Sequence, residues 1–146
     1  MQAEEYLKRI RRLNSFAKIK QEELEELRER IASVGSIDYT ADRVQSSPSP
    51  DKLVNAVIKL TDAEDRYKKA LDELYTLKAE AEQRVETIEN DKYRLVLMLR
   101  YFRFMTFEAI AEEMGFSNQW VQTLHERALM QFEKKFFTNF STVDCS

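Results

Sequence analysis

The sequence predicts an all-α protein in which a long antiparallel helical hairpin, similar to a coiled coil, precedes a helix-turn-helix domain. Two long stretches carry apolar residues in alternating steps of three and four, and a segment rich in serine and proline separates them. Further along, a glycine interrupts a shorter helical pattern. We expect the hairpin over residues 1–90, the helix-turn-helix domain over 91–140 and a flexible tail over 141–146.

The first long helix is predicted over residues 3–34, where the heptad stripe has Lys20 as its only polar member. A helix of that length extends about 48 Å at 1.5 Å per residue. Gly35 is expected to end it, and residues 35–50 to form a connector. The stripe comprises Ala3, Tyr6, Ile10, Leu13, Ala17, Lys20, Leu24, Leu27, Ile31 and Val34.

A basic cluster lies near the start of this helix, formed by Lys8, Arg9, Arg11 and Arg12. One interpretation is an edge that binds phosphate groups. The other is a solvated face, or a set of cations paired with acids on an adjacent helix, and this second interpretation is the more common outcome for such charge runs. Both stay open at the level of the sequence.

A second long helix is predicted from a cap at Asp51. Its apolar stripe is wider than the seam between two helices requires. The spare apolar positions suggest that two hairpins meet as a four-helix bundle in a homodimer, or that the hairpin docks on a protein partner. We favour self-association over a monomeric hairpin. The stripe is Leu53, Ala56, Leu60, Ala63, Tyr67, Ala70, Leu74, Leu77 and Ala81, flanked by Val57, Leu71, Val85 and Ile88.

A third helix is predicted over residues 91–104, capped by Asn90 and Asp91 and apolar on most sides. Such a helix would support the elements that follow it. Among the later apolar residues, we expect Leu129, Met130 and Phe132 to pack back onto it, whereas the positions of Phe136, Phe137 and Phe140 stay open.

The helix-turn-helix is predicted over residues 106–127. Thr106 and Ser117 are suited to cap the two helices, and Gly115 to adopt the left-handed conformation at the turn between them. Spacings of three and four direct one set of residues inward: Phe107, Ile110, Ala111 and Met114 in the first helix, and Val121, Leu124 and Ala128 in the second. In DNA-binding modules of this design, the second helix enters the major groove.

The candidate DNA-binding residues are Ser117, Asn118, Gln119, Trp120, Gln122, Thr123, Glu126, Arg127 and Lys134. The amides would read bases, because an amide side chain can pair bidentately with adenine. Thr123 would touch a thymine methyl group or a phosphate, and Arg127 and Lys134 would neutralise the backbone. Glu126 is either a cytosine reader or a group that rejects wrong sites. For Trp120 we favour a core or rim position, and His125 is expected to be structural.

Several residue counts argue against catalysis, cofactors and metals. Cys145 is the only cysteine, His125 the only histidine, and the two glycines cannot form a phosphate-binding loop. These counts lead us to expect a protein that is not an enzyme. No apolar run approaches the length of a membrane span, and the N-terminus carries charged residues where a signal peptide would need an apolar core, so we expect a cytoplasmic protein. The net charge of −3 implies weak non-specific affinity for DNA.

The stretch over roughly residues 91–135 resembles region four of bacterial sigma factors. The resemblance rests on Arg94 to Tyr101, Thr106 to Glu112, Gly115 to Ser117, Val121 and Arg127 to Leu129. It implies that Asn118, Gln119, Trp120, Gln122 and Thr123 contact double-stranded promoter DNA, with bacterial RNA polymerase as a further partner. The overall layout is similar to phage regulators of late transcription of the RinA and ArpU kind, which implies a bacterial host cell.

Two alternatives remain. A phage terminase small subunit also joins a helix-turn-helix to a helical oligomerisation region, and would form a ring that serves DNA packaging. A module that binds polymerase without contacting DNA is the other alternative. The mass of the protein in solution separates packaging from regulation, and DNA binding separates regulation from the polymerase-binding module.

Overall fold

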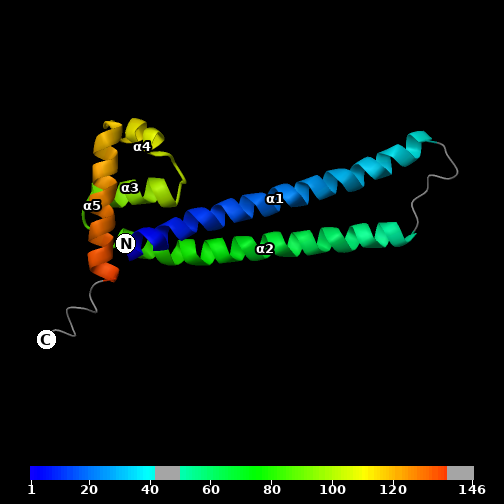
Figure 1. Ribbon diagram of the computed structural model, residues 1–146, viewed down its shortest axis with the longest axis horizontal. Helices are drawn as coiled ribbons and strands as arrows, with labels where there is room; N and C mark the ends of the chain where they lie inside the picture. The colour runs from blue at the N-terminus through cyan, green and yellow to red at the C-terminus, as the bar shows by residue number, and fades with distance from the viewer. Residues whose placement is uncertain (42–49, 138–146) are drawn as a thin grey trace. The chain divides into compact units, whose positions relative to one another are not determined.

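The computed structural model describes residues 1–41 and 50–137, and at residues 34–41 it describes the backbone alone. The described residues form five helices: α1 (Gln2–Ala41), α2 (Pro50–Glu86), α3 (Asp91–Tyr101), α4 (Phe107–Met114) and α5 (Asn118–Phe136) (Figure 1). The predicted fold class is confirmed, since two long packed helices precede a three-helix region. Within the described ranges, we find no helix whose length and hydropathy would let it span a bilayer.

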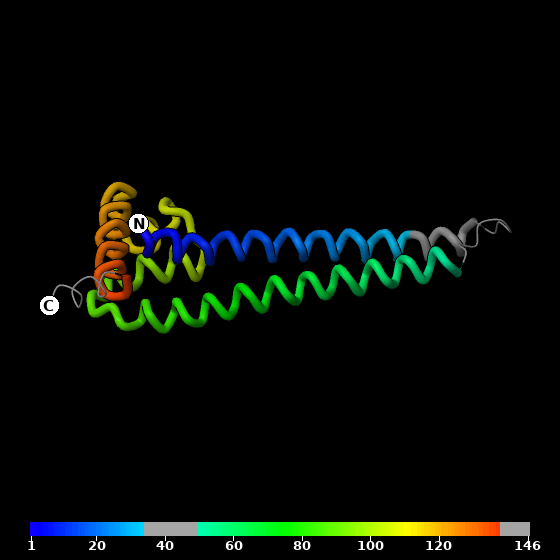
Figure 2. Tube along the Cα trace, turned by 60° about the horizontal axis from the view of Figure 1, so that its bottom comes forward, coloured from blue at the N-terminus to red at the C-terminus, as the bar shows by residue number. Residues whose placement is uncertain are grey.

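The chain divides into two compact units, which we treat separately. The hairpin unit is Asn14–Glu73, and the helix-turn-helix unit combines Met1–Leu13 with Leu74–Ser146. In the hairpin unit, α1 and α2 run side by side in opposite directions (Figures 1 and 2). Ala17 and Leu24 are buried in their seam, and Arg28 Nη2 lies 3.5 Å from Glu64 Oε1 across it. The alternating apolar pattern therefore does form a helix–helix seam.

The ends of the long helices differ from the prediction. Gly35 does not end α1, which continues to Ala41. An interior glycine costs a helix only about 1 kcal/mol relative to alanine and terminates it only where the backbone turns left-handed. Helix α2 begins at Pro50, so Asp51 lies in its first turn and is not its cap; proline suits a first helical position because its missing N–H is not needed there.

The core of the helix-turn-helix unit draws on all five helices. Its members are almost completely inaccessible to solvent, and each such apolar side chain contributes roughly 1.5–3 kcal/mol through burial. The largest fully buried side chains are Leu7, Ile10, Val85, Ile88, Val96, Leu97, Tyr101, Ile110, Val121 and Phe132. Polar contacts join the same elements: Tyr6 donates to Glu80 Oε1 at 2.7 Å, and Lys135 Nζ donates to the Thr87 carbonyl at 2.7 Å.

Helix α3 begins as predicted and ends early. The side chain of Asn90 accepts hydrogen bonds from the N–H groups of Lys92 and Tyr93, which confirms the cap. The helix stops at Tyr101, three residues before the predicted end. Phe104 has a φ of 59°, a left-handed conformation that a helix cannot contain. Periodicity missed this end because Phe102, just past it, is still buried.

Most of the predicted packing at the end of α5 is confirmed. Leu129 and Phe132 are buried, whereas Met130 is 60% exposed, so its predicted packing is wrong. Met130 follows Leu129 by about 100° around the helix and so faces solvent. Phe137 lies edge-on to Tyr6 with ring centroids 5.7 Å apart, and Phe136 is 4.9 Å from Phe132. Phe140, the tail over 141–146 and the side chain of Val34 lie outside the described residues.

The shared core predicts a large effect of Leu7→Ala. Leu7 is fully buried, so its truncation should lower the free energy of unfolding by about 2–5 kcal/mol. Leu95→Ala is the matched control, because Leu95 is 43% exposed and should cost clearly less. Urea unfolding of both variants measures the difference, and equal losses would contradict a core that includes the start of α1.

Candidate nucleic-acid interface

Three predicted caps fix the turn between α4 and α5, and all three are confirmed. Thr106 Oγ1 accepts a hydrogen bond from the N–H of Ala109 at 3.2 Å. Gly115 adopts φ 73° and ψ 31°, which glycine reaches at little cost. Ser117 Oγ then accepts from the N–H of Trp120 at 3.1 Å. The first turn of α5 therefore starts in a direction set by the capped turn.

The inward face of α5 is also as predicted. Val121 and Ala128 are fully buried, and Leu124 is 3% exposed. Opposite them, Ile110 and the small side chain of Ala111 are buried on α4. A helix held this tightly along one side presents its other side to solvent in a fixed orientation.

The predicted base-reading residues lie together on that other side. Asn118, Gln119, Gln122 and Glu126 are exposed, and we call these four residues the reading face. Thr123 is half-buried, and its hydroxyl donates to the Gln119 carbonyl at 3.2 Å, so its only donor is engaged within the helix. Contact between these side chains and DNA stays a prediction.

The remaining predicted residues form a second group at another edge of α5. Trp120 is 38% exposed, and the Arg127 guanidinium lies 5.3 Å from its ring centroid, within the range of a cation–π interaction. Arg127 and Lys134 line a shallow hollow of about 570 Å³. Lys134 is roughly 24 Å along the helix from Asn118 at 1.5 Å per residue, so it cannot serve the same base pairs.

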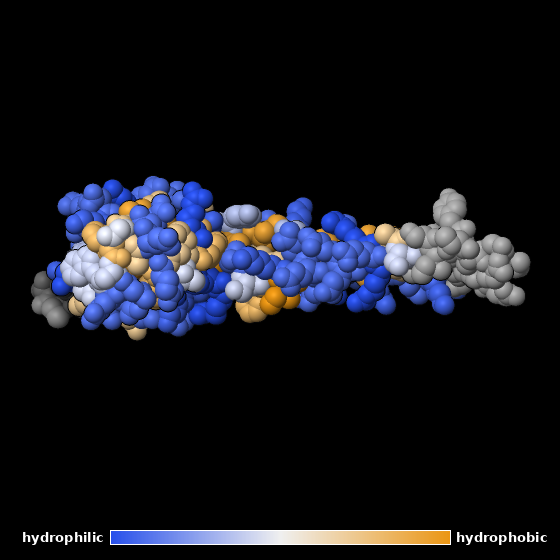
Figure 3. Space-filling model, turned by 90° about the horizontal axis from the view of Figure 1, so that it is seen from above, coloured by the Kyte–Doolittle hydropathy of each residue, from blue (hydrophilic) through white to orange (hydrophobic). Residues whose placement is uncertain are grey.

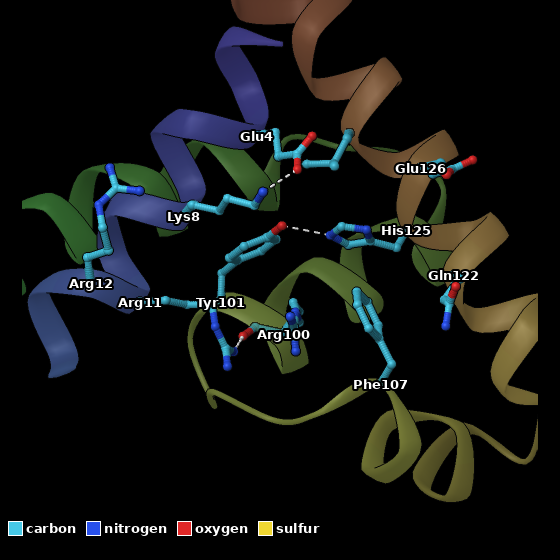
Figure 4. A pocket seen from close by; sticks show the side chains of 11 residues that line it. Glu4, Lys8, Arg11, Arg12, Arg100, Tyr101, Phe107, Gln122, His125 and Glu126 are labelled. Carbon is cyan, nitrogen blue, oxygen red and sulfur yellow. Dashed lines mark hydrogen bonds and ion pairs between the residues drawn. The ribbon is translucent and has the colours of Figure 1, made fainter.

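A cavity of about 500 Å³ borders the reading face on its other edge, and we call it the basic cavity. Figure 4 shows basic side chains from the start of α1 on one side of it and Gln122 and Glu126 of α5 on the other. Its charged members are Glu4, Lys8, Arg11, Arg12, Arg100 and Glu126. The sequence indicated the basic cluster and did not place it beside the reading face. Only the spacing of Lys8, Arg11 and Arg12 signalled a common face.

The cations of the basic cavity are held in two different ways. Lys8 pairs with Glu4, and Arg12 Nη2 lies 3.3 Å from Glu5 Oε2, both on the surface of α1. Arg11 Nη1 instead donates to the Arg100 carbonyl at 2.6 Å. Arg100 donates to the Met105 carbonyl at 3.0 Å and lies 4.0 Å over the Phe107 ring, and partial burial lowers its pKa.

His125 forms the buried wall of the cavity, in agreement with its expected structural role. Its Nε2 lies 2.7 Å from the hydroxyl of Tyr101, and its ring lies 5.0 Å from that of Phe107. Burial, and next to it the charge of Arg100, lower the pKa of His125 to about 4. Burial raises the pKa of Tyr101 to about 12. Both groups are therefore neutral near pH 7.

A short capped helix and a longer capped helix joined at a left-handed glycine, the second with a polar exposed face, define a helix-turn-helix of the DNA-binding class. Residues 90–132 match the family model for Sigma-70, region 4, a non-catalytic module that binds promoter DNA. The match spans less than a third of the chain. A search of curated proteins and a search of solved structures each return no match. In the described part of the chain, no group of three or more possible metal ligands gathers.

The lowered pKa of His125 predicts a loss of stability in acid. The unfolded chain takes up this proton near pH 6.5 and the folded chain only near pH 4, so stability is complete above pH 6.5 and falls as the pH drops toward 4. The loss is at most about 3 kcal/mol for this group. Arg100 opposes protonation, as does Lys8, whereas Glu4 favours it.

His125→Gln isolates this effect, because an amide can accept from Tyr101 and does not titrate in this range. Urea unfolding between pH 7 and pH 4 should show that the free energy of unfolding falls less in the variant than in the natural protein. If the free energy of unfolding depended on pH in the same way in both proteins, the buried imidazole would not govern the acid sensitivity.

Proposed function

We propose that this protein is a sequence-specific DNA-binding transcription regulator that acts at promoters together with host RNA polymerase. The observation that carries the proposal is the reading face: an amide-rich, exposed surface at the first turns of a capped second helix. Asn and Gln side chains discriminate adenine in the major groove through two simultaneous hydrogen bonds. The match to Sigma-70, region 4 supports promoter DNA as the target.

A phage origin, with the bacterial cytoplasm as the place of action, completes the proposal. It rests on a resemblance of layout to phage late-transcription regulators, because a long helical segment precedes the helix-turn-helix in this chain. The net charge of −3 adds to the argument for partners, because few phosphate contacts can form without assistance. Polymerase bound beside the protein, or a second copy of the chain, would supply the missing affinity.

We propose that the second copy associates through the hairpin unit. Phe16 and Ile19 on α1 are 55% and 47% exposed, although neither belongs to the seam between the helices. On α2, Val54 and Ile58 are 56% and 53% exposed, one turn apart. Figure 3 shows apolar surface in orange between the polar areas of the long helices. Exposed apolar groups of this size are typical of interaction surfaces, and a dimer would present two reading helices to two half-sites.

Gln119→Ala combined with Gln122→Ala tests base reading. With duplexes selected from a random-sequence pool by the natural protein, the double variant should lose about 1–3 kcal/mol of discrimination per lost amide pair at fixed salt. Gln131→Ala, at an exposed position of the same helix outside the reading face, should keep the preference. An unchanged preference in the double variant would refute the assignment. A chain that binds polymerase and no duplex would support the polymerase-binding alternative.

Val54→Lys combined with Ile58→Lys tests self-association. Both side chains are exposed, so the helix should persist while the dimer separates into monomers, as measured by sedimentation equilibrium. Asn55→Lys is the control at an exposed polar position of α2 and should stay dimeric. A natural protein that is monomeric would contradict the proposed dimer. A large closed ring would instead favour the terminase alternative, in which the helix-turn-helix serves DNA packaging.

A further inference from the structure

We propose that the basic cavity is a phosphate-binding site for the DNA backbone. In this site, Lys8 and Arg12 of α1 bind phosphate groups of the strand that flanks the major groove contacted by α5. The inference rests on the proposed function and names a contact that the helix-turn-helix alone does not supply. The cavity is lined from α1 by Lys8, Arg11 and Arg12 and from α5 by Gln122 and Glu126. The reading face and a group of cations therefore share one concave surface (Figure 4).

The position of the cavity suits a phosphate at the edge of the major groove. A helix in this groove, which is about 12 Å wide, has a sugar-phosphate backbone on each side. At 3.6 residues per turn, Arg127 lies roughly 140° around α5 from Gln122. Arg127 and the basic cavity therefore border the reading face on opposite edges, where the two backbones would run.

Lys8 and Arg12 are free to change partner at little cost. The side chains of Lys8 and Glu4 are 48% and 37% exposed, and those of Arg12 and Glu5 are 52% and 67% exposed. Exposed ion pairs contribute only about 0–1 kcal/mol, because water and salt screen them. A phosphate carries a full negative charge and releases counterions when it is neutralised, so it competes well for both cations.

Arg11 and Arg100 differ from Lys8 and Arg12, because backbone carbonyls hold them in place as fixed charges of the cavity. Arg11 donates to the Arg100 carbonyl, and Arg100 is held by the Met105 carbonyl and the Phe107 ring. An arginine side chain is the residue of choice for a fixed positive charge in a protein. Two carboxylates, Glu4 and Glu126, face four cations in the cavity. Glu126 projects from α5 and repels a phosphate from that wall, which directs it toward α1.

The test compares Lys8→Gln/Arg12→Gln with Lys18→Gln/Lys68→Gln in the full-length chain. Lys18 and Lys68 are exposed cations of the hairpin unit, so the control removes the same charge. Fluorescence anisotropy with a labelled mixed-sequence duplex gives the slope of log K against log salt. The first variant should lower the magnitude of the slope by about 2, since each phosphate contact contributes about 0.9, and the control should not change it. If the Lys8→Gln/Arg12→Gln variant kept the salt slope of the natural protein, the proposal would be overturned.

A second arm distinguishes backbone phosphate from a free phosphate compound. Inorganic pyrophosphate is titrated calorimetrically into the natural protein and the Lys8→Gln/Arg12→Gln variant without DNA. Weak binding is expected in the natural protein, because one cavity cannot reproduce the contacts of a duplex, and weaker binding in the variant, because it lacks two of the four cations of the cavity. Tight pyrophosphate binding that the variant loses, with an unchanged duplex slope, would overturn the DNA assignment in favour of a small-anion site.

The Gln119→Ala/Gln122→Ala variant separates this inference from the proposed function. It should lose site preference and retain the natural salt slope, because amides release no counterions. If the natural protein shows a site preference and the Lys8→Gln/Arg12→Gln slope is unchanged, only the phosphate site fails. If the natural protein binds no duplex, the proposed function fails and the phosphate site fails with it.

Discussion

The burial of one entire side of α5 is the constraint on which the rest of the structure depends. Val121, Leu124, Ala128 and Phe132 lie in the core, and no other helix contributes so many buried residues to the helix-turn-helix unit. The same packing sets the direction of the exposed amides and brings the basic start of α1 beside them. His125 completes this face through its contact with Tyr101, so a neutral imidazole is part of the support of the reading helix.

Recognition and affinity are supplied by different parts of the proposed interface. The reading face has amides and one carboxylate, which suit discrimination between bases and contribute little attraction to phosphate. Cations lie at its edges, with Arg127 on one side and the basic cavity on the other. A chain with a net charge of −3 can bind DNA when some of its cations are concentrated in this way and when two copies act together.

Local chemistry made the helix-turn-helix predictable. The caps at Asn90, Thr106 and Ser117 and the turn at Gly115 depend on residues within a few positions of one another. Features that depend on distant parts of the chain were not predictable. Leu7 lies off the heptad positions and is fully buried in a unit that also contains residues from the far end of the chain. The basic cavity depends on long-range packing, and the early end of α3 depends on a turn geometry that periodicity does not report. Helix α1 continues through Gly35 because an interior glycine costs a helix little.

The most direct test of the central claim is a crystal structure of the full-length protein with a duplex selected from a random-sequence pool. We expect α5 in the major groove, with Gln119 and Gln122 at base edges and Lys8 and Arg12 at phosphate oxygens of the flanking strand. A complex in which α5 lies outside the groove, with the amides in solvent and DNA held by another surface, would contradict the account.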